Sequence, residues 1–81
     1  MSLQTKYKHI HFVHVMDKTT TSEWTCNNNS TGDLLGTVKW YSNWRQYVFI
    51  PIFLVPTVFS VSCLEDINHF IGQLEAKRKG V

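Results

Sequence analysis

The amino-acid sequence predicts an α+β fold, in which a small antiparallel sheet of three or four strands carries one carboxy-terminal amphipathic helix on one face. From Tyr7 to about Val61, β-branched and aromatic residues alternate with polar clusters, as in strands; from Ser62 onward the apolar residues recur at helical spacing. Strands followed by one amphipathic helix pack as two layers. The 81 residues form a single domain, residues 1–81, of which we expect residues 1–6 to be disordered or derived from an expression vector.

Short apolar runs bounded by turn residues predict the first two strands. The first covers residues 8–16 and places Ile10 and Phe12 on the same face of the sheet. Residues 17–21 then form a turn, and the second strand covers residues 23–27. The segment NNNSTGD follows and is rich in residues that tolerate left-handed backbone geometry, so we expect a loop there.

The third and fourth strands are predicted to form a hairpin. The third strand covers residues 35–41, the tetrad 42–45 turns the chain, and the fourth strand covers residues 47–50. The tetrad contains no Asn-Gly pair, so we expect a connection of about three to five residues. Pro51 and Pro56 cannot donate a ladder hydrogen bond, which confines the segment between them to an edge strand or an extended connector.

The helix is predicted from its cap and its apolar face. Ser62 and Glu65 fit the S-x-x-E capping box directly before the apolar series. Five apolar residues share one helical face and are expected to be buried: Leu64, Ile67, Phe70, Ile71 and Leu74. The basic residues 77–79 suit the negative end of the helix dipole, and Gly80 can end the helix.

Composition limits the possible partners. The net charge of +2 is too small to indicate a polyanion by itself. The most apolar window, residues 47–61, is shorter than the roughly 20 residues that cross a bilayer, so we expect no membrane partner. The amino terminus lacks the apolar segment of a signal peptide. Cys26 and Cys63 lack CxxC spacing, and we expect two reduced thiols.

The histidines and cysteines do not assemble into a predicted chemical site. His9 and His11 alternate along one strand face, but a metal site needs a third ligand, and no spacing places His69, Asp66 or Cys63 beside them. The helix dipole favours a thiolate at Cys63, yet His69 lies nearly on the opposite side of the same helix. We therefore expect no metal, no cofactor, no catalytic residue, no small-molecule substrate and no enzymatic activity.

The aromatic hairpin is the candidate binding site. We expect Tyr41, Tyr47 and Phe49, with Lys39 and Arg45, to lie on the sheet face opposite the helix. An uncovered aromatic patch on a small domain usually marks a contact site. The candidate binding residues are Lys39, Tyr41, Asn43, Trp44, Arg45 and Tyr47. Such a patch suits a protein partner, and it also suits nucleic acid, since aromatic faces stack on bases and cations contact phosphates.

A structural role for the same hairpin is the third alternative. Trp40 and Phe49 would then fill the core. Arg45 would stack on Trp44, and Tyr41 and Tyr47 would form a cross-strand pair. The sequence alone does not choose between this role and the contact surface.

The strings GDLLGTVKWYSNWRQYVFIP and CLEDINHFI resemble a group of small proteins encoded by bacteriophages and prophages, for which no activity is established. The shared features are a tryptophan strand, a GxxLG turn, a WYxxWRxYxFxP hairpin and a CLxxIxxFI helix, within residues 22–76. The resemblance implies a phage or bacterial origin, and hence the cytoplasm of a bacterial host. We expect a binding module that contacts a host or phage protein or forms a homodimer, with nucleic acid as the alternative partner.

Overall fold

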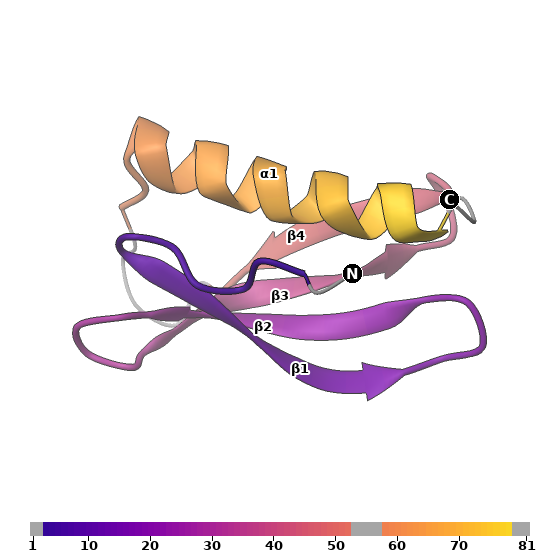
Figure 1. Cartoon of the computed structure of the whole chain (residues 1–81), viewed down its shortest axis with the longest axis horizontal. Helices are drawn as coiled ribbons and strands as arrows, with labels where there is room; N and C mark the ends of the chain where they lie inside the picture. The colour runs from indigo at the N-terminus through magenta and orange to yellow at the C-terminus, as the bar shows by residue number, and fades with distance from the viewer. Residues whose placement is uncertain (1–2, 53–57, 79–81) are drawn as a thin grey trace.

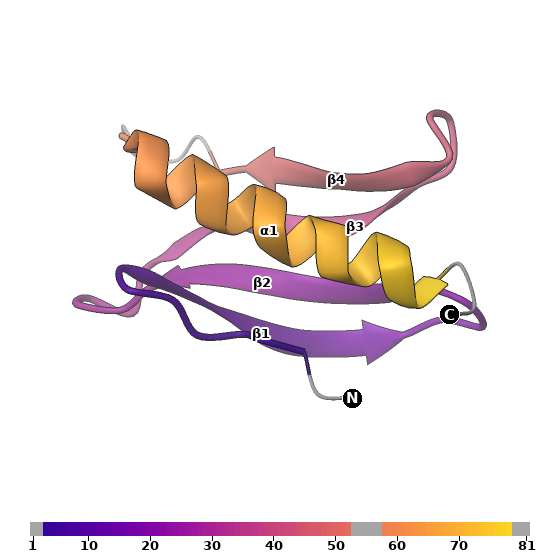
Figure 2. The same cartoon turned by 45° about the horizontal axis from the view of Figure 1, so that its top comes forward.

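The computed structural model describes residues 3–52 and 58–78, and within them it contains four strands and one helix (Figure 1). The elements are β1 (Ile10–Asp17), β2 (Ser22–Asn28), β3 (Leu34–Tyr41), β4 (Gln46–Pro51) and α1 (Val61–Arg78). The strands form one antiparallel sheet, and α1 lies diagonally across one of its faces (Figure 2). The predicted α+β fold is confirmed, with four strands.

Each strand pairs with its neighbour in the chain, so the order across the sheet is β1-β2-β3-β4, and β1 and β4 are its edges. The strands begin and end within one or two residues of the predicted positions. The register places Phe12, Cys26 and Gly36 in one row across β1, β2 and β3. Pro51 ends an edge strand, as expected, whereas residues 53–57 lie outside the described residues.

The connections between the strands follow the predicted turn chemistry. In the loop after β2, Oδ1 of Asn28 accepts hydrogen bonds from the backbone N–H groups of Ser30 at 2.7 Å and Thr31 at 3.2 Å. Gly32 in this loop has φ of 76°, a left-handed conformation that glycine adopts without steric cost. Residues 42–45 connect β3 and β4, which confirms the expected loop length.

The hydrophobic core lies between the sheet and α1 and is centred on Phe70. Its ring stacks on that of Phe12 with centroids 4.0 Å apart, and it meets Trp24 edge to face at 5.1 Å. The buried hydrophobic residues are Ile10, Phe12, Cys26, Val38, Tyr47, Ile67, Phe70 and Leu74. Because burying one large apolar side chain contributes about 1.5–3 kcal/mol, this cluster is the main link between the two layers.

The amino-terminal cap of α1 differs from the predicted one. The helix begins at Val61, and Oγ of Ser60 accepts the backbone N–H of Cys63 at 3.2 Å. The donor lies three residues after Ser60, which is the spacing between an N-cap residue and the backbone N–H group that its side chain accepts. Ser62 is therefore inside the helix, and the predicted capping box of Ser62 and Glu65 is wrong. Ser60 occupies the position that the box assigned to Ser62.

The predicted apolar face of α1 is confirmed except at its first residue. Ile67, Phe70 and Leu74 are buried, and Ile71 is half-buried against the core. Leu64, which we expected to be buried, is 52% exposed. Leu64 belongs to the first turn of α1, and this turn extends past the end of β4 (Figure 2).

The amino-terminal segment is held by both layers. The backbone N–H of Phe12 in β1 donates to the carbonyl of Thr5 at 2.8 Å. Gln4 and Gln73 of α1 exchange two hydrogen bonds, from Gln4 N–H to Gln73 Oε1 at 2.8 Å and from Gln73 Nε2 to the Gln4 carbonyl at 3.0 Å. Residues 3–6, which we expected to be disordered or vector-derived, thus make specific contacts with the first strand and the helix.

Candidate functional site

The sheet face opposite α1, here called the open face, carries every second side chain of each strand. The register aligns Val13, Thr25, Thr37 and Ile50 in one row that crosses all four strands. The two ends of this row are apolar and belong to the edge strands, whereas the centre carries threonine hydroxyl groups. Val13 and Ile50 are both exposed.

A neighbouring row repeats this arrangement with charges at its centre. Met16 of β1 pairs with Glu23 of β2, and Lys39 of β3 pairs with Val48 of β4. Continuing the β2–β3 register one residue beyond Trp24 brings Glu23 beside Lys39. The open face therefore has apolar margins on β1 and β4 and a polar stripe along β2 and β3.

Beside this row, residues of β3, β4 and their connection enclose a shallow hollow of about 240 Å³, here called the hairpin hollow. It is lined by Tyr41, Trp44, Val48, Phe49, Ile50 and Pro51. The rings of Tyr41 and Trp44 meet edge to face with centroids 5.1 Å apart, and Nδ2 of Asn43 donates to the Tyr41 hydroxyl at 3.3 Å. Trp44 is 66% exposed. Because its lining is mostly carbon, the hollow suits an apolar side chain.

The structure brings only part of the predicted binding set onto the open face. Lys39 and Tyr41 lie on it, and Asn43, Trp44 and Arg45 belong to the exposed connection at its end. Arg45 adopts φ of 55°, which reverses the chain at the last residue of this connection. Five of the six predicted binding residues thus lie on the open face or at its end, and one does not.

Tyr47 is the exception, and its expected exposure is wrong. It pairs with Trp40 across the hairpin, so both side chains point toward α1, and Tyr47 is only 6% exposed. Its hydroxyl accepts the backbone N–H of Ser22 at 3.1 Å, and its own backbone N–H donates to Oε2 of Glu75 at 2.8 Å. Phe49, two residues further along β4, also faces the helix side and packs against the core.

The expected structural contacts of the hairpin are also corrected. Tyr47 meets Trp40 edge to face with centroids 5.6 Å apart, and its cross-strand partner is not Tyr41, which pairs with Gln46. The guanidinium group that stacks on a tryptophan in the described residues is that of Arg78, 4.4 Å above the Trp40 ring. Trp40 is partly buried and packs against the core, as the structural alternative proposed.

Sequence reasoning did not single out the apolar margins of the open face. Val13, Met16, Val48 and Ile50 alternate with the inward residues of β1 and β4, and this alternation was the available signal. The signal was weak because a bulge between His14 and Met16 interrupts it on β1.

The histidines make separate structural contacts. His11 and His14 bond to Asn29 and Asp17 through ring nitrogens at 2.7 and 2.9 Å. Nδ1 of His69 lies 2.8 Å from the Tyr7 hydroxyl, whose pKa is raised by burial. Among residues 3–52 and 58–78, no group of three metal-binding side chains comes together.

The two cysteines are free thiols on the inner side of the molecule. Cys26 is buried in the sheet, and Cys63 is half-buried in the first turn of α1. Burial and the neighbouring Cys63 raise the pKa of Cys26 to about 12. A thiol with so high a pKa stays protonated at neutral pH and is a poor nucleophile.

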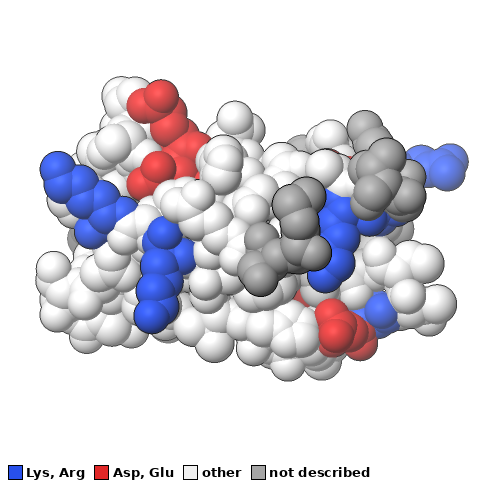
Figure 3. Space-filling view, in the orientation of Figure 1, with Lys and Arg blue, Asp and Glu red and all other residues white. Residues whose placement is uncertain are grey.

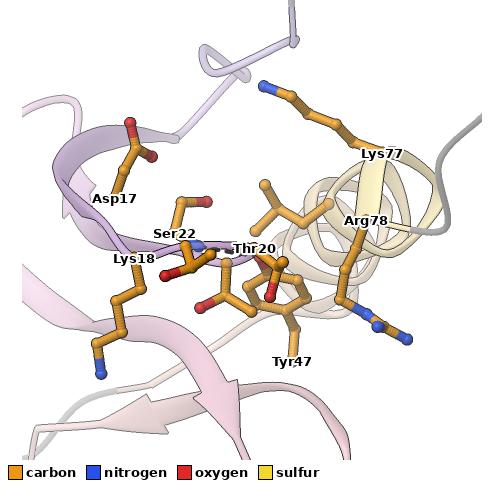
Figure 4. A pocket seen from close by; sticks show the side chains of 10 residues that line it. Asp17, Lys18, Thr20, Ser22, Tyr47, Lys77 and Arg78 are labelled. Carbon is orange, nitrogen blue, oxygen red and sulfur yellow. Dashed lines mark hydrogen bonds between the residues drawn. The ribbon is translucent and has the colours of Figure 1, made fainter.

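A second hollow, of about 440 Å³, lies between the β1–β2 turn and the end of α1 (Figure 4). The Tyr47 side chain forms part of its wall, and the cations around it are Lys18, Lys77 and Arg78. Figure 4 shows these three side chains pointing in different directions, with their charged groups away from one another. They do not converge on a point where they would bind one anion.

Charged side chains of opposite sign are interspersed over the visible surface. In Figure 3 the lysines and arginines are spread along the molecule, with acidic groups near both ends. No large basic field covers this side of the described surface, which fits the small net charge of +2.

Comparison with protein-family models, curated proteins and solved structures finds no match to this chain. Within the described residues, α1 does not combine the length and apolarity that a membrane-crossing helix requires. The fold and the site together define a small α+β domain whose sheet has one face covered by a helix and one face open.

Proposed function

We propose that the chain is a non-enzymatic binding module whose open face contacts a protein. The observation that carries this proposal is the apolar character of the exposed margins, at Val13, Met16 and Ile50, together with the hairpin hollow beside them. Extended apolar patches on small domains are commonly contact sites, because leaving them in water is unfavourable. A phage or prophage origin and a bacterial cytoplasmic location are part of the proposal, supported by the resemblance within residues 22–76.

The lining of the hairpin hollow favours protein over nucleic acid. Its side chains offer carbon surface and the Tyr41 hydroxyl, whereas nucleic-acid affinity depends largely on cations that neutralise phosphates. Within the predicted set, the cations are Lys39 and Arg45, and Glu23 lies in the same row as Lys39. The exposed ring of Trp44 is the feature that favours nucleic acid, because a base could stack on it.

The proposal is tested by capturing partners from a bacterial lysate after nuclease treatment, with the full chain and two variants as baits. Ile50→Lys places a charge on the apolar margin, and Asn68→Lys places the same charge on an exposed position of α1. A captured protein is purified, and its dissociation constant is measured directly against all three chains. We expect Ile50→Lys to weaken binding roughly tenfold or more, as burying an unpaired charge would, and Asn68→Lys to leave it unchanged.

Equal affinity of all three chains for the purified partner would contradict a role for the open face. A parallel titration with labelled single-stranded and duplex DNA at low salt tests the alternative. Salt-sensitive DNA binding that Trp44→Ala abolishes, without any captured protein, would replace the protein proposal with nucleic-acid recognition.

A further inference from the structure

We infer that the partner of the open face is a second copy of this chain, packed face to face about a twofold axis parallel to the strands. This inference rests on the proposed function and specifies its partner. Three features of the described residues support it: protected sheet edges, a sufficient open area, and a self-complementary arrangement of charged and apolar side chains.

The edge of β4 offers little to an added strand. The backbone N–H of Tyr47 already donates to Glu75 at 2.8 Å, and Pro51 has no N–H to donate. The backbone nitrogens of Tyr47 and Pro51 point away from β3, toward the free edge of the sheet, because the two residues lie an even number of positions apart on β4. A partner strand would therefore find few free donors on this edge, which is how proteins prevent edge-to-edge pairing.

The edge of β1 is protected in a different way. The amino-terminal segment covers its first half, through hydrogen bonds from Tyr7 N–H to the Ile10 carbonyl at 2.9 Å and from Phe12 N–H to the Thr5 carbonyl at 2.8 Å. Its second half contains the bulge after His14, which disrupts a regular ladder. With both edges protected, the open face offers a partner an apolar surface on which to pack.

The open face is large enough for a stable dimer. Strand spacings of about 4.8 Å and rises of about 3.3 Å per residue give a face of roughly 19 by 26 Å, taking the 8 residues of β3 as its length. Two such faces bury roughly 1,000 Å² in total, which is about the minimum area of a specific interface. Sheets that pack in this way lie about 10 Å apart with their strands nearly aligned.

The arrangement of side chains selects the axis. A twofold axis parallel to the strands and midway between β2 and β3 places β2 of one copy over β3 of the other, and β1 over β4. Glu23 of each copy then faces Lys39 of the other, because the two residues lie in the same row. The same rotation brings the apolar margin of β1, with Val13 and Met16, onto that of β4, with Val48 and Ile50.

Charge exchange tests this arrangement. The single variants Glu23→Lys and Lys39→Glu each place like charges opposite one another in their homodimers, and we expect each to weaken dimerisation roughly tenfold or more. Mixing the two variants should restore the dimer, because every facing pair in the heterodimer is then of opposite sign. Attraction between the net charges of the two chains does not explain such a result, because Glu23→Lys changes the net charge from +2 to +4 and Lys39→Glu changes it from +2 to 0.

The measurement is sedimentation velocity over a wide concentration range, with circular dichroism to verify that each variant is folded. The wild-type chain, with a monomer mass of 9.5 kDa, should approach twice that mass as concentration rises. The matched controls Glu65→Lys and Lys8→Glu make the same charge changes at exposed positions away from the open face and should dimerise like the wild type.

Each other outcome overturns a defined part of the reasoning. A wild-type mass of 9.5 kDa at all concentrations would refute a second copy as the partner. The proposed function would still be supported if the chain bound another protein and Ile50→Lys weakened that binding. A dimer unaffected by either single charge variant would refute the facing of Glu23 and Lys39. A mixture that stays monomeric while both single variants are monomeric would refute the axis parallel to the strands.

Discussion

Replacing Gly36 with alanine should destabilise the fold, although glycine-to-alanine changes inside strands usually stabilise. The normal gain is about 0.5–1 kcal/mol, because alanine loses less backbone freedom on folding. A Cβ at Gly36, however, would lie 2.5 Å from Cζ of Phe49 and 2.7 Å from the carbonyl oxygen of Ile50. The second of these neighbours is backbone, so relief requires a shift of β4 itself.

The structure limits how far Phe49 can move to make room. Its ring meets Phe59 edge to face with centroids 5.8 Å apart and packs against the core. Overpacking of this kind costs about 1–3 kcal/mol, which exceeds the gain in backbone entropy. We expect a net loss of roughly 1–2 kcal/mol, which for a domain of this size lowers the melting temperature by about 4–8 °C per kcal/mol.

Thermal unfolding followed by circular dichroism measures this effect. The matched control is Gly72→Ala on α1, where a Cβ would meet nothing within 4 Å. This variant should stabilise the helix by about 0.5–1 kcal/mol. In a Phe49→Leu background, Gly36→Ala should cost less, because the nearest ring atoms are gone. A melting temperature that rises in Gly36→Ala, as it does in Gly72→Ala, would refute the close approach of Phe49.

Three further predictions concern the helix cap, a buried hydroxyl and a buried thiol. Ser60→Ala should lower the free energy of unfolding in urea by about 1 kcal/mol, whereas Ser62→Ala should change it by less than about 0.5 kcal/mol; equal losses would contradict the observed cap. Tyr47→Phe should cost about 1 kcal/mol, because the Ser22 N–H loses its acceptor, and an unchanged urea midpoint would contradict that bond. Since the pKa of Cys26 rises from 9.0 to about 12 on folding, the stability linked to its bound proton is complete below about pH 9 and is lost toward pH 12. The melting temperature should therefore fall more steeply between pH 9 and pH 12 for the wild type than for Cys26→Ala.

The layers of the fold were predictable because local signals and tertiary packing agree. Alternation placed Ile10 and Phe12 on the inner face of the first strand, and both are buried against the helix layer. The Asn-rich segment after β2 forms the expected loop through the Asn28 side chain. Consistency of pattern and turn chemistry is what makes a small sheet readable from its sequence.

The placement of Tyr47 shows where such reasoning loses accuracy. The side of the sheet on which Tyr47 lies depends on the hairpin register, and a change of one residue moves a side chain to the other face. The four-residue connection 42–45 pairs Trp40 with Tyr47, so assigning Trp40 to the core should have placed Tyr47 there too. Because the sequence predicted only a range of three to five residues for this connection, it did not determine the face on which Tyr47 lies.

Other features had no local signal at all. Ser60 lacks a glutamate three residues later, so the neighbouring serine, Ser62, gave the better match to a capping box. The bonds between Gln4 and Gln73 join residues 69 positions apart, and nothing in a polar amino-terminal segment indicates that it lies against the helix. The rows of the open face likewise depend on the register of three strand pairs together.

The neighbour-to-neighbour order of the strands has a consequence for synthesis on the ribosome. Each hairpin can close as soon as its second strand emerges, since no strand waits for a distant partner, and such local topologies fold rapidly. The helix is translated last, and at about 5–20 residues per second it follows β4 by a second or more. During that interval the nascent sheet exposes Phe12 and Val38 to water, so a chain stalled before Val61 would be a natural substrate for chaperones.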